Sequence, residues 1–303
     1  MRPCVRGSEQ GKILVTVSGK ELDIGFAVLS YAQIIVLGVI QGITELLPIS
    51  STAHMRIVPA VLGWRDPGSA FSAAMQMAAL TAVVSYFWSD VRGVVTGTIS
   101  AVRRSDYQDQ SFRMAVAIVL ATIPIGIAGL ALSHLLNAPN SPLRSLMVIG
   151  CSCVGMAILM AIAELTCKHT RSMKEMRLRD ALIIGVAQIG ALIPGVSRSG
   201  STLTAALFLN LKREEAARFS FLLGLPAIAL AGLKELLELH HAHIPADAWL
   251  HLLVGIVVAS ISAFAAIWGL MKFLERFSTW PFIIYRAALG ILLIAGVSAG
   301  WLA

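Results

Sequence analysis

The chain has 303 residues, of which 57% are hydrophobic and 14% are charged, and its mean hydropathy is +0.78. A soluble domain is about half apolar and about a quarter charged, so this composition excludes an ordinary cytosolic enzyme, a secreted disulfide scaffold and a disordered chain. Lys and Arg number 24 against 17 Asp and Glu. In a membrane protein such an excess marks cytoplasmic loops, so we do not interpret it as nucleic-acid binding.

The first 23 residues differ from the rest of the chain. They carry several charges, and their one apolar run, Ile13–Val17, is too short for the core of a signal peptide. We expect residues 1–23 to form a peripheral tail, and a start codon assigned too early is the alternative explanation. Residues 24–303 are expected to form a single membrane domain.

From Ile24 onward, apolar segments alternate with short charged stretches. Two of these regions, 25–65 and 181–212, are interrupted by Pro, Gly and Ser, which predicts re-entrant helical hairpins whose free backbone groups are satisfied by protein or water. The other segments are long enough to cross about 30 Å of hydrocarbon. The six predicted transmembrane helices lie near residues 70–88, 113–133, 145–166, 216–238, 249–272 and 281–301.

Basic residues gather in four of the connecting loops. With six spans and two hairpins, all four loops fall on one side of the membrane, which the positive-inside rule makes cytoplasmic. The opposite loops are poor in Lys and Arg, since 134–144 contains Arg144 alone and 239–248 contains none. Both termini and the mouth of the first hairpin are then expected on the outer side. The basic loop residues are Arg92, Arg103, Arg104, Arg113, Lys168, Arg171, Lys174, Arg177, Arg179, Lys212, Arg213, Arg218, Lys272 and Arg276.

The two interrupted regions resemble each other. Residues 38–41 (GVIQ) and 49–51 (ISS) correspond to residues 185–188 (GVAQ) and 196–198 (VSR), 147 positions later. Each half contains one hairpin and three crossings, and an odd number of crossings inverts the second copy. We therefore predict an all-α polytopic membrane protein built as an inverted-topology repeat, in which the two hairpins meet at the midplane. The halves are about 24–166 and 181–303.

The first hairpin concentrates polar side chains in an apolar setting. Gln41 and Glu45 are four residues apart, so they share one face of a helix. Pro48 ends that helix, and the hydroxyl groups that follow suit the start of a second half-helix, with His54 three residues after Ser51. Buried ionisable groups are costly in a membrane, which favours a functional interpretation over helix capping and an ion pair of Glu45 with an Arg. The polar residues are Gln41, Glu45, Ser50, Ser51, Thr52 and His54.

The second hairpin, Pro194–Thr202, reads PGVSRSGST. Small residues allow close backbone approach, and hydroxyl and N–H groups at a helix start suit an anion. Arg198 adds a planar fork that matches phosphate or carboxylate oxygens. By itself the segment fits a helix break whose Arg pairs with Glu45. Together the hairpins predict an oxyanion site, with acid and base groups on the first and an anion clamp on the second.

These motifs closely resemble the signature motifs of the bacterial undecaprenyl-diphosphate phosphatases, also called bacitracin-resistance proteins. The resemblance rests on Gln41-x-x-x-Glu45, on Leu47–His54 and on Pro194–Thr202, in this order and spacing, and it extends from about Ile24 to the C-terminus. It implies a bacterial inner-membrane hydrolase that converts undecaprenyl diphosphate to undecaprenyl phosphate and inorganic phosphate. Such an enzyme recycles the lipid carrier for peptidoglycan synthesis and confers bacitracin resistance. It also implies a divalent cation, Mg²⁺ or alternatively Ca²⁺.

The resemblance assigns roles by position. Gln41 and Glu45 would belong to the metal-linked motif, in which Glu45 is the single carboxylate because the leading position holds Gln; the diphosphate is expected to supply the remaining charge. Ser51, His54 and a water remain alternative nucleophiles. The implied catalytic residues are Glu45, Ser51, His54 and Arg198, and the implied phosphate-binding residues are Ser50, Ser197, Arg198, Ser199 and Thr202.

The main alternative is a transporter or flippase of a phosphorylated lipid or anion, because inverted repeats with midplane half-helices are typical of carriers. A carrier would need Arg198 but has little use for Ser51 beside His54 and Glu45, so the acid and base groups favour the hydrolase. The active site is expected to open to the periplasmic side, where it acts on a polyprenyl diphosphate lipid. The sequence leaves open the oligomeric state, a homodimer among the candidates, and whether flipping accompanies hydrolysis.

Overall fold

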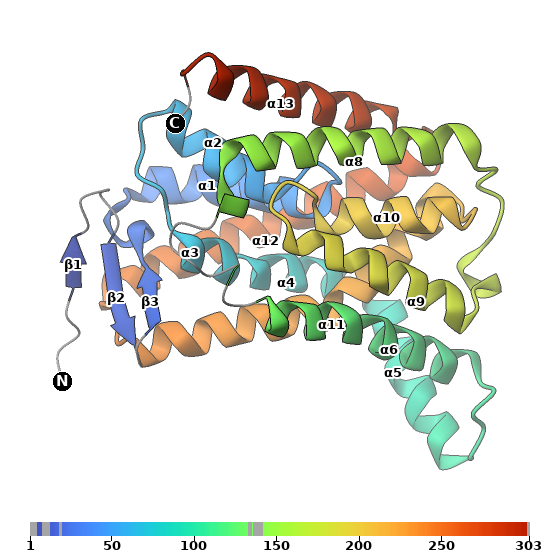
Figure 1. Cartoon of the computed structure of the whole chain (residues 1–303). Coiled ribbons are helices and arrows are strands. Elements are labelled where there is room, and N and C mark those ends of the chain that lie inside the picture. The colour runs from blue at the N-terminus through green and yellow to red at the C-terminus, as the bar shows by residue number, and fades with distance from the viewer. Residues whose placement is uncertain (1–4, 8–12, 18–19, 133–134, 136–141, 302–303) are drawn as a thin grey trace. The chain divides into compact units, whose positions relative to one another are not determined.

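The computed structural model describes residues 5–7, 13–17, 20–132, 135 and 142–301 (Figure 1). Three short strands near the N-terminus pair antiparallel in the order β1-β2-β3, with Val15 opposite both Val5 and Leu22. The predicted peripheral tail thus contains a small sheet, which its mixed charged and apolar pattern did not indicate. The strands are β1 (Val5–Gly7), β2 (Ile13–Val17) and β3 (Lys20–Asp23).

Beyond the sheet, the described chain is mainly helical (Figure 1). The α-helices are α1 (Tyr31–Leu46), α2 (Ser51–Val61), α3 (Ser69–Ala74), α4 (Gln76–Tyr86), α5 (Trp88–Arg103), α6 (Gln110–Ala131), α8 (Leu146–Thr166), α9 (Leu178–Ala187), α10 (Arg198–Phe208), α11 (Arg213–His241), α12 (Ala246–Leu274) and α13 (Trp280–Ser298). Short 3₁₀ helices cover Gly25–Val28, Pro142–Arg144, Met173–Glu175 and Gln188–Leu192.

Among the described residues, α6, α8, α11, α12 and α13 are each long and apolar enough to cross a membrane. A sixth crossing is obtained if residues 70–86 and α5, which meet at an angle of 79°, are counted as one bent span. The span predicted near 70–88 corresponds to residues 70–86 of this pair, where the helix ends at Tyr86 and the chain turns at Phe87 into α5. Asp90 in the first turn of α5 forms an ion pair with Arg218, which holds the new direction.

Both predicted hairpins consist of two helical arms with a break between them. Residues 47–50 separate α1 from α2, and residues 193–197 separate the 3₁₀ helix after α9 from α10. A proline in each break supports the interruption, because the residue before a proline disfavours helical geometry. At corresponding positions of the two breaks, Ser50 and Ser197 have positive φ angles of 71° and 68°.

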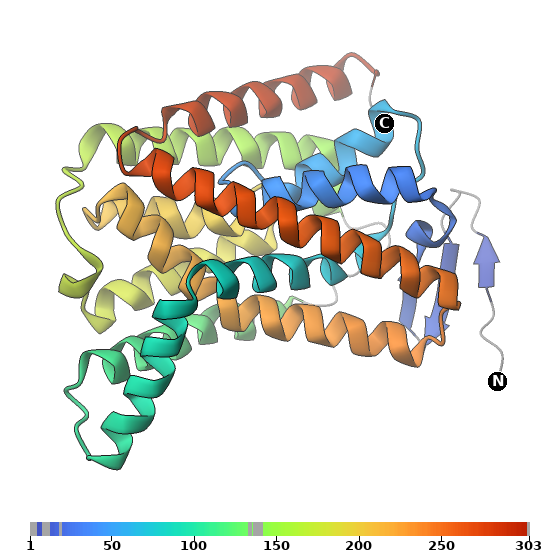
Figure 2. The same ribbon diagram turned by 180° about the vertical axis from the view of Figure 1, so that it is seen from behind.

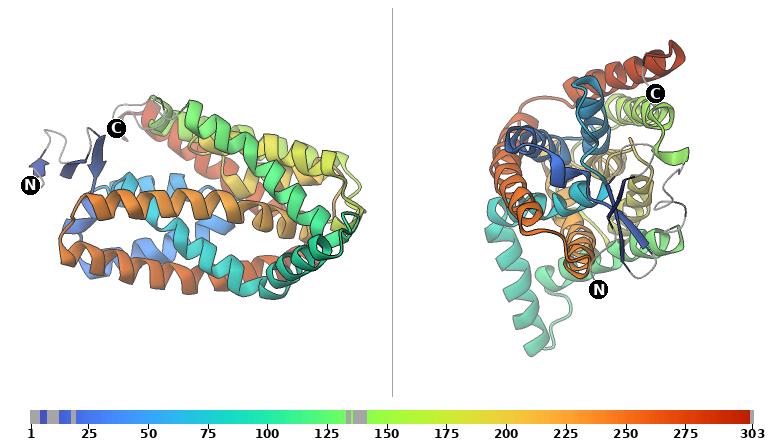
Figure 3. Two further views of the ribbon diagram at one scale, coloured as in Figure 1. Left: turned by 90° about the horizontal axis from the view of Figure 1, so that it is seen from below. Right: turned by 90° about the vertical axis from the view of Figure 1, so that its left-hand side faces the viewer.

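The chain divides into two compact units. Unit one has a core of fully buried side chains around Phe26, Leu37 and Phe71. In unit two, α13 packs along α8, α6 along α9, and α5 against α6 (Figures 2 and 3). A Cβ atom on Gly290 would lie 2.7 Å from the carbonyl oxygen of Gly150, so the α8–α13 contact requires glycine there. Unit one comprises residues 1–46, 51–82 and 228–266; unit two comprises 47–50, 83–227 and 267–303.

Candidate active site

The first hairpin brings three of the predicted residues together within unit one. Gln41 and Glu45 lie one turn apart near the end of α1, and Ser51 begins α2. The Glu45 Oε2 atom accepts a hydrogen bond of 2.9 Å from Gln41 Nε2 and one of 2.6 Å from Ser51 Oγ. The same carboxylate oxygen therefore contacts both the amide and the hydroxyl group.

A serine hydroxyl that donates to a carboxylate is the arrangement of a nucleophile and its general base. The distance of 2.6 Å between Ser51 Oγ and Glu45 Oε2 is at the short end of the range for hydrogen bonds between oxygen atoms. Glu45 can therefore take the proton as Ser51 attacks. His54 follows in the first turn of α2 and is buried, with 9% of its surface exposed.

The Gln41 side chain offers an oxygen atom to a metal ion. Its Oε1 atom is buried, and among the described residues it has no hydrogen-bond partner. An acceptor oxygen beside a carboxylate suits a hard divalent cation such as Mg²⁺, which often takes few protein ligands and completes its shell with water and phosphate oxygens. The described part of the chain contains no cluster of three or more His, Cys, Asp or Glu side chains that could hold a metal ion.

The second hairpin forms a serine-rich helix start in unit two. Ser197 is the N-cap of α10, where its Oγ atom accepts a hydrogen bond of 3.2 Å from the backbone N–H of Gly200. The Ser197 and Ser199 hydroxyl groups lie 3.1 Å apart, and Arg198 between them is the half-buried first residue of the helix. The N-terminal end of a helix favours an anion through its free N–H groups and its dipole.

Thr202 occupies a different setting from these serines. It is fully buried, its hydroxyl donates to the Arg198 carbonyl oxygen over 2.8 Å, and it also contacts the hydroxyl of Ser220 in α11. These contacts anchor the first turn of α10 against α11. The phosphate-binding role that the resemblance implies for Thr202 stays a prediction.

Arg286, in the middle of α13, is a residue that the motifs did not indicate. It is fully buried, and its guanidinium donates to four backbone carbonyl oxygens of unit two. Nη1 contacts Pro48 over 3.0 Å, Nη2 contacts Gly195 and Val196 over 2.5 Å each, and Nε contacts Cys153 over 3.3 Å. Pro48 and Gly195 are 147 positions apart, so Arg286 binds the corresponding carbonyl in both breaks.

A second contact joins the same segments. The Ser199 hydroxyl donates to the Leu47 carbonyl oxygen over 3.2 Å, so residues 47–50 pack against the start of α10 within unit two. Glycine at position 200 is required here, because a Cβ atom would lie 2.5 Å from Arg286 Nη1. The partners of Arg286 are backbone atoms and leave no sequence signature. The available signal was an arginine inside an apolar span, which is rare and usually functional.

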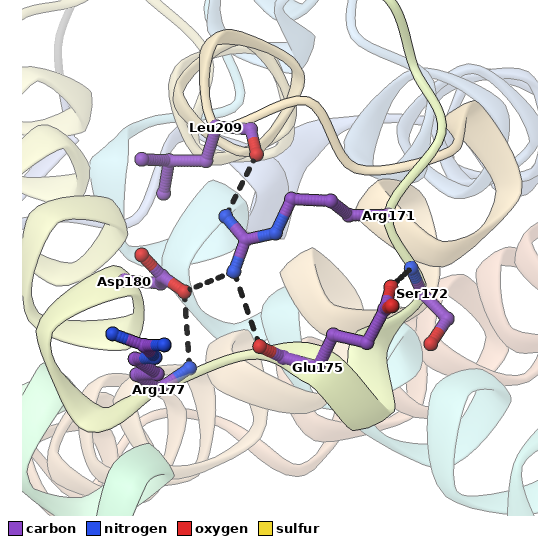
Figure 4. Close-up of polar contacts among 6 residues, drawn as sticks. All are labelled: Arg171, Ser172, Glu175, Arg177, Asp180 and Leu209. Carbon is purple, nitrogen blue, oxygen red and sulfur yellow. Dashed lines mark hydrogen bonds and ion pairs between the residues drawn. The ribbon is translucent and has the colours of Figure 1, made fainter.

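The open end of the second hairpin is held by Arg171 (Figure 4). Its guanidinium donates to the Leu209 carbonyl oxygen over 3.0 Å at the end of α10, and to Asp180 Oδ2 over 2.6 Å at the start of α9. Asp180 also accepts from the Arg177 backbone N–H over 3.0 Å. Burial acts to raise the pKa of the Asp180 carboxyl, but the hydrogen bonds from Arg177 and Arg171 outweigh it and hold this pKa below its ordinary value.

The fold and these residues define a polytopic membrane protein with two interrupted hairpins, one carrying a carboxylate–hydroxyl pair and the other an arginine at a serine-rich helix start. Residues 34–292 match the family model described as bacitracin resistance protein BacA, and the chain belongs to this family. The family resemblance of the motifs is thereby confirmed. The matched region includes both hairpins and Arg286.

Several curated proteins are similar over most of their length. Undecaprenyl-diphosphatase 2 of Mesorhizobium japonicum is 71% identical over 87% of this chain and 100% of its own length. Undecaprenyl-diphosphatase of a Synechococcus species is 47% identical over 98% of both chains. The Gloeobacter violaceus protein of the same name is 50% identical over 89% of this chain and 93% of its own.

Proposed function

We propose that this chain hydrolyses undecaprenyl diphosphate to undecaprenyl phosphate and inorganic phosphate, and thereby recycles the lipid carrier for peptidoglycan synthesis and confers bacitracin resistance. The observation that carries the proposal is the 2.6 Å hydrogen bond from Ser51 Oγ to Glu45. The names of the similar proteins support the substrate. A carrier of anions has no need of a paired nucleophile and base.

In the proposed first step, Ser51 Oγ attacks the terminal phosphorus while its proton passes to Glu45. The bond from that phosphorus to the bridging oxygen breaks, and undecaprenyl phosphate leaves. In the second step His54, which has given its proton to the departing oxygen, takes a proton from water, and this water attacks the phosphoserine. The bond from phosphorus to Ser51 Oγ breaks, Glu45 returns its proton to Ser51, and inorganic phosphate leaves. We assign His54, in the same helical turn as Ser51, to proton transfer at the departing oxygen.

Charge neutralisation is the main demand of phosphoryl transfer. We assign it to Arg198 with the hydroxyl groups of Ser197 and Ser199, and to Ser50 and Thr202 as further phosphate-binding residues. Supporting this, residues 47–50, which connect Glu45 to Ser51 in the chain, contact the start of α10 through the Ser199 hydroxyl.

The resemblance also implies a cation. We propose that Gln41 Oε1 and Glu45 hold Mg²⁺, with Ca²⁺ as the alternative, together with the diphosphate. When bound, the ion supplies positive charge that offsets the charge of the substrate. The buried, unpartnered Gln41 Oε1 supports this assignment.

We place the protein in the bacterial inner membrane with the active site open to the periplasmic side. The several membrane-crossing helices establish a multi-pass membrane protein. The clustering of Lys and Arg in four loops supports the orientation, because basic loops remain cytoplasmic.

The test measures phosphate release from undecaprenyl diphosphate by the purified protein in detergent, with and without Mg²⁺. A substrate labelled in its terminal phosphate, quenched with acid during a single turnover, is expected to leave label on Ser51. Release without any labelled protein would contradict the serine nucleophile. No release by well-folded protein would contradict the hydrolase itself and favour the carrier.

A further inference from the structure

A cavity of about 520 Å³ opens at the N-terminal ends of α6 and α9 within unit two, and none of its described lining residues is among those assigned to catalysis. Its floor consists of the buried side chains of Ala117, Ala181 and Phe219. Methionine and aromatic side chains form much of its wall. They are Tyr107, Phe112, Met114, Met173 and Met176.

The rim of this cavity is cationic. Arg113, Lys174 and Arg177 line it from α6, from the 3₁₀ helix Met173–Glu175 and from the residue before α9, and all three are exposed. None of its described lining residues is acidic. In the part of the chain that the structure describes, Arg113 and Lys174 form no ion pair. Asp180 lies beside Arg177, but its carboxylate is already bonded to Arg171.

The position of the cavity relates it to the bilayer. It lies at the first turns of α6, a membrane-crossing helix whose face carries Val119, Ile127 and Leu130 at 58%, 64% and 75% exposure. Such a face is solvated by lipid tails. The cationic rim lies at the end of this helix, and the headgroup region of a bilayer lies at the ends of the helices that cross it.

We propose that this cavity binds one anionic phospholipid, with its phosphate at Arg113, Lys174 and Arg177 and its acyl chains against the methionine and aromatic wall. Basic pockets at the ends of membrane helices recognise such headgroups because each cation adds attraction at the surface. Flexible methionine side chains can pack against lipid acyl chains of varied shape. Its described lining residues are not those of the proposed diphosphate site, and the proposal does not depend on the proposed hydrolysis.

The test titrates the full-length protein in neutral maltoside micelles with dioctanoyl-phosphatidylglycerol and counts bound lipids by native mass spectrometry. Wild type is expected to bind one lipid saturably and to bind the zwitterionic dioctanoyl-phosphatidylcholine about tenfold more weakly. Each neutralised cation should weaken binding about fivefold. The variant Arg113→Gln/Lys174→Gln/Arg177→Gln should therefore lose about 100-fold in affinity.

A matched variant, Arg92→Gln/Arg103→Gln/Lys168→Gln, removes the same charge from exposed positions elsewhere in unit two and should bind within about twofold of wild type. If the triple variant fails to fold, the single variant Lys174→Gln, on an exposed turn, replaces it and should weaken binding about fivefold. Equal losses in both triple variants would overturn the proposal, as would loss in Arg198→Ala instead. Displacement of the lipid by an equal concentration of inorganic phosphate would show a free-phosphate site and overturn the lipid assignment.

Discussion

Ser50 and Ser197 are 147 positions apart, and both have the positive φ angle that residues other than glycine rarely adopt. Such conformations cost about 1–3 kcal/mol each and persist where the surroundings enforce them. Here Arg286 binds the carbonyl oxygens of Pro48 and of Gly195 and Val196, just before the two serines. A serine with positive φ thus precedes the second arm of each hairpin, and one side chain binds carbonyl oxygens just before both serines.

Loss of the Ser51 hydroxyl should abolish turnover. Ser51→Ala is expected to lower kcat by at least about 10³-fold, because the nucleophile is removed. Glu45→Gln should lower it by about 10²–10⁴-fold, since an amide cannot accept the proton. The double variant should be hardly worse than Ser51→Ala, because the two groups act as a unit. Phosphate release measures all three, and Ser85→Ala, at an exposed position, is the control.

Arg286→Met should destabilise the protein by about 3 kcal/mol or more, because it leaves several buried carbonyl oxygens without donors. Arg286→Lys keeps the charge but loses the planar fork, so it should fall between wild type and Arg286→Met in stability. Thermal unfolding in detergent measures both, and the exposed Arg276→Met is the control. Equal stability of Arg286→Met and Arg276→Met would refute the structural role of this guanidinium.

Gln41→Glu should strengthen the binding of Mg²⁺. A second carboxylate beside Glu45 adds negative charge to a site that now has one, so the Mg²⁺ concentration for half-maximal phosphate release should fall several-fold. Removing divalent ions with a chelator should stop release by both proteins without unfolding them. An unchanged Mg²⁺ requirement in the variant would place the ion away from Gln41.

Acid should weaken the Arg171–Asp180 contact. The folded state lowers the pKa of Asp180, so this carboxylate contributes stability that is present above the unfolded pKa of about 4 and is lost as the pH falls through the folded value. The difference in unfolding temperature between wild type and Asp180→Asn should therefore be largest near neutral pH and shrink below about pH 4. Asp247→Asn, at an exposed residue, should show no such trend.

The sequence predicted much of the fold because membranes impose strong rules. Long apolar runs gave five of the spans, and Pro48 and Pro194 with their serines marked both breaks. The bend at Phe87 escaped prediction because it depends on Asp90 meeting Arg218, which is distant in the sequence. The N-terminal sheet escaped because its strands are short and their pattern is weak.

For the candidate site too, the sequence predicted some residues and missed the contacts of others. Side chains that carry chemistry, such as Glu45, Ser51 and Arg198, could be found from residue type and spacing. The hydrogen bonds of Thr202 and Arg286 could not be found in this way. The Thr202 hydroxyl bonds within α10 and to Ser220, and the Arg286 guanidinium bonds to backbone carbonyl oxygens. Contacts of this kind cannot be predicted from residue type or spacing, because they form only when the fold brings the atoms together.

The position of Arg286 in α13 also determines when the two hairpin turns are completed. The ribosome makes α13 well after the two breaks whose carbonyl oxygens Arg286 binds. An arginine at the centre of a span opposes insertion by about 2.5–3.5 kcal/mol, so α13 depends on those carbonyl groups as much as they depend on it. Insertion of α13 and completion of both hairpin turns are therefore one event, and the turns that carry the site residues are not fixed before α13 is inserted.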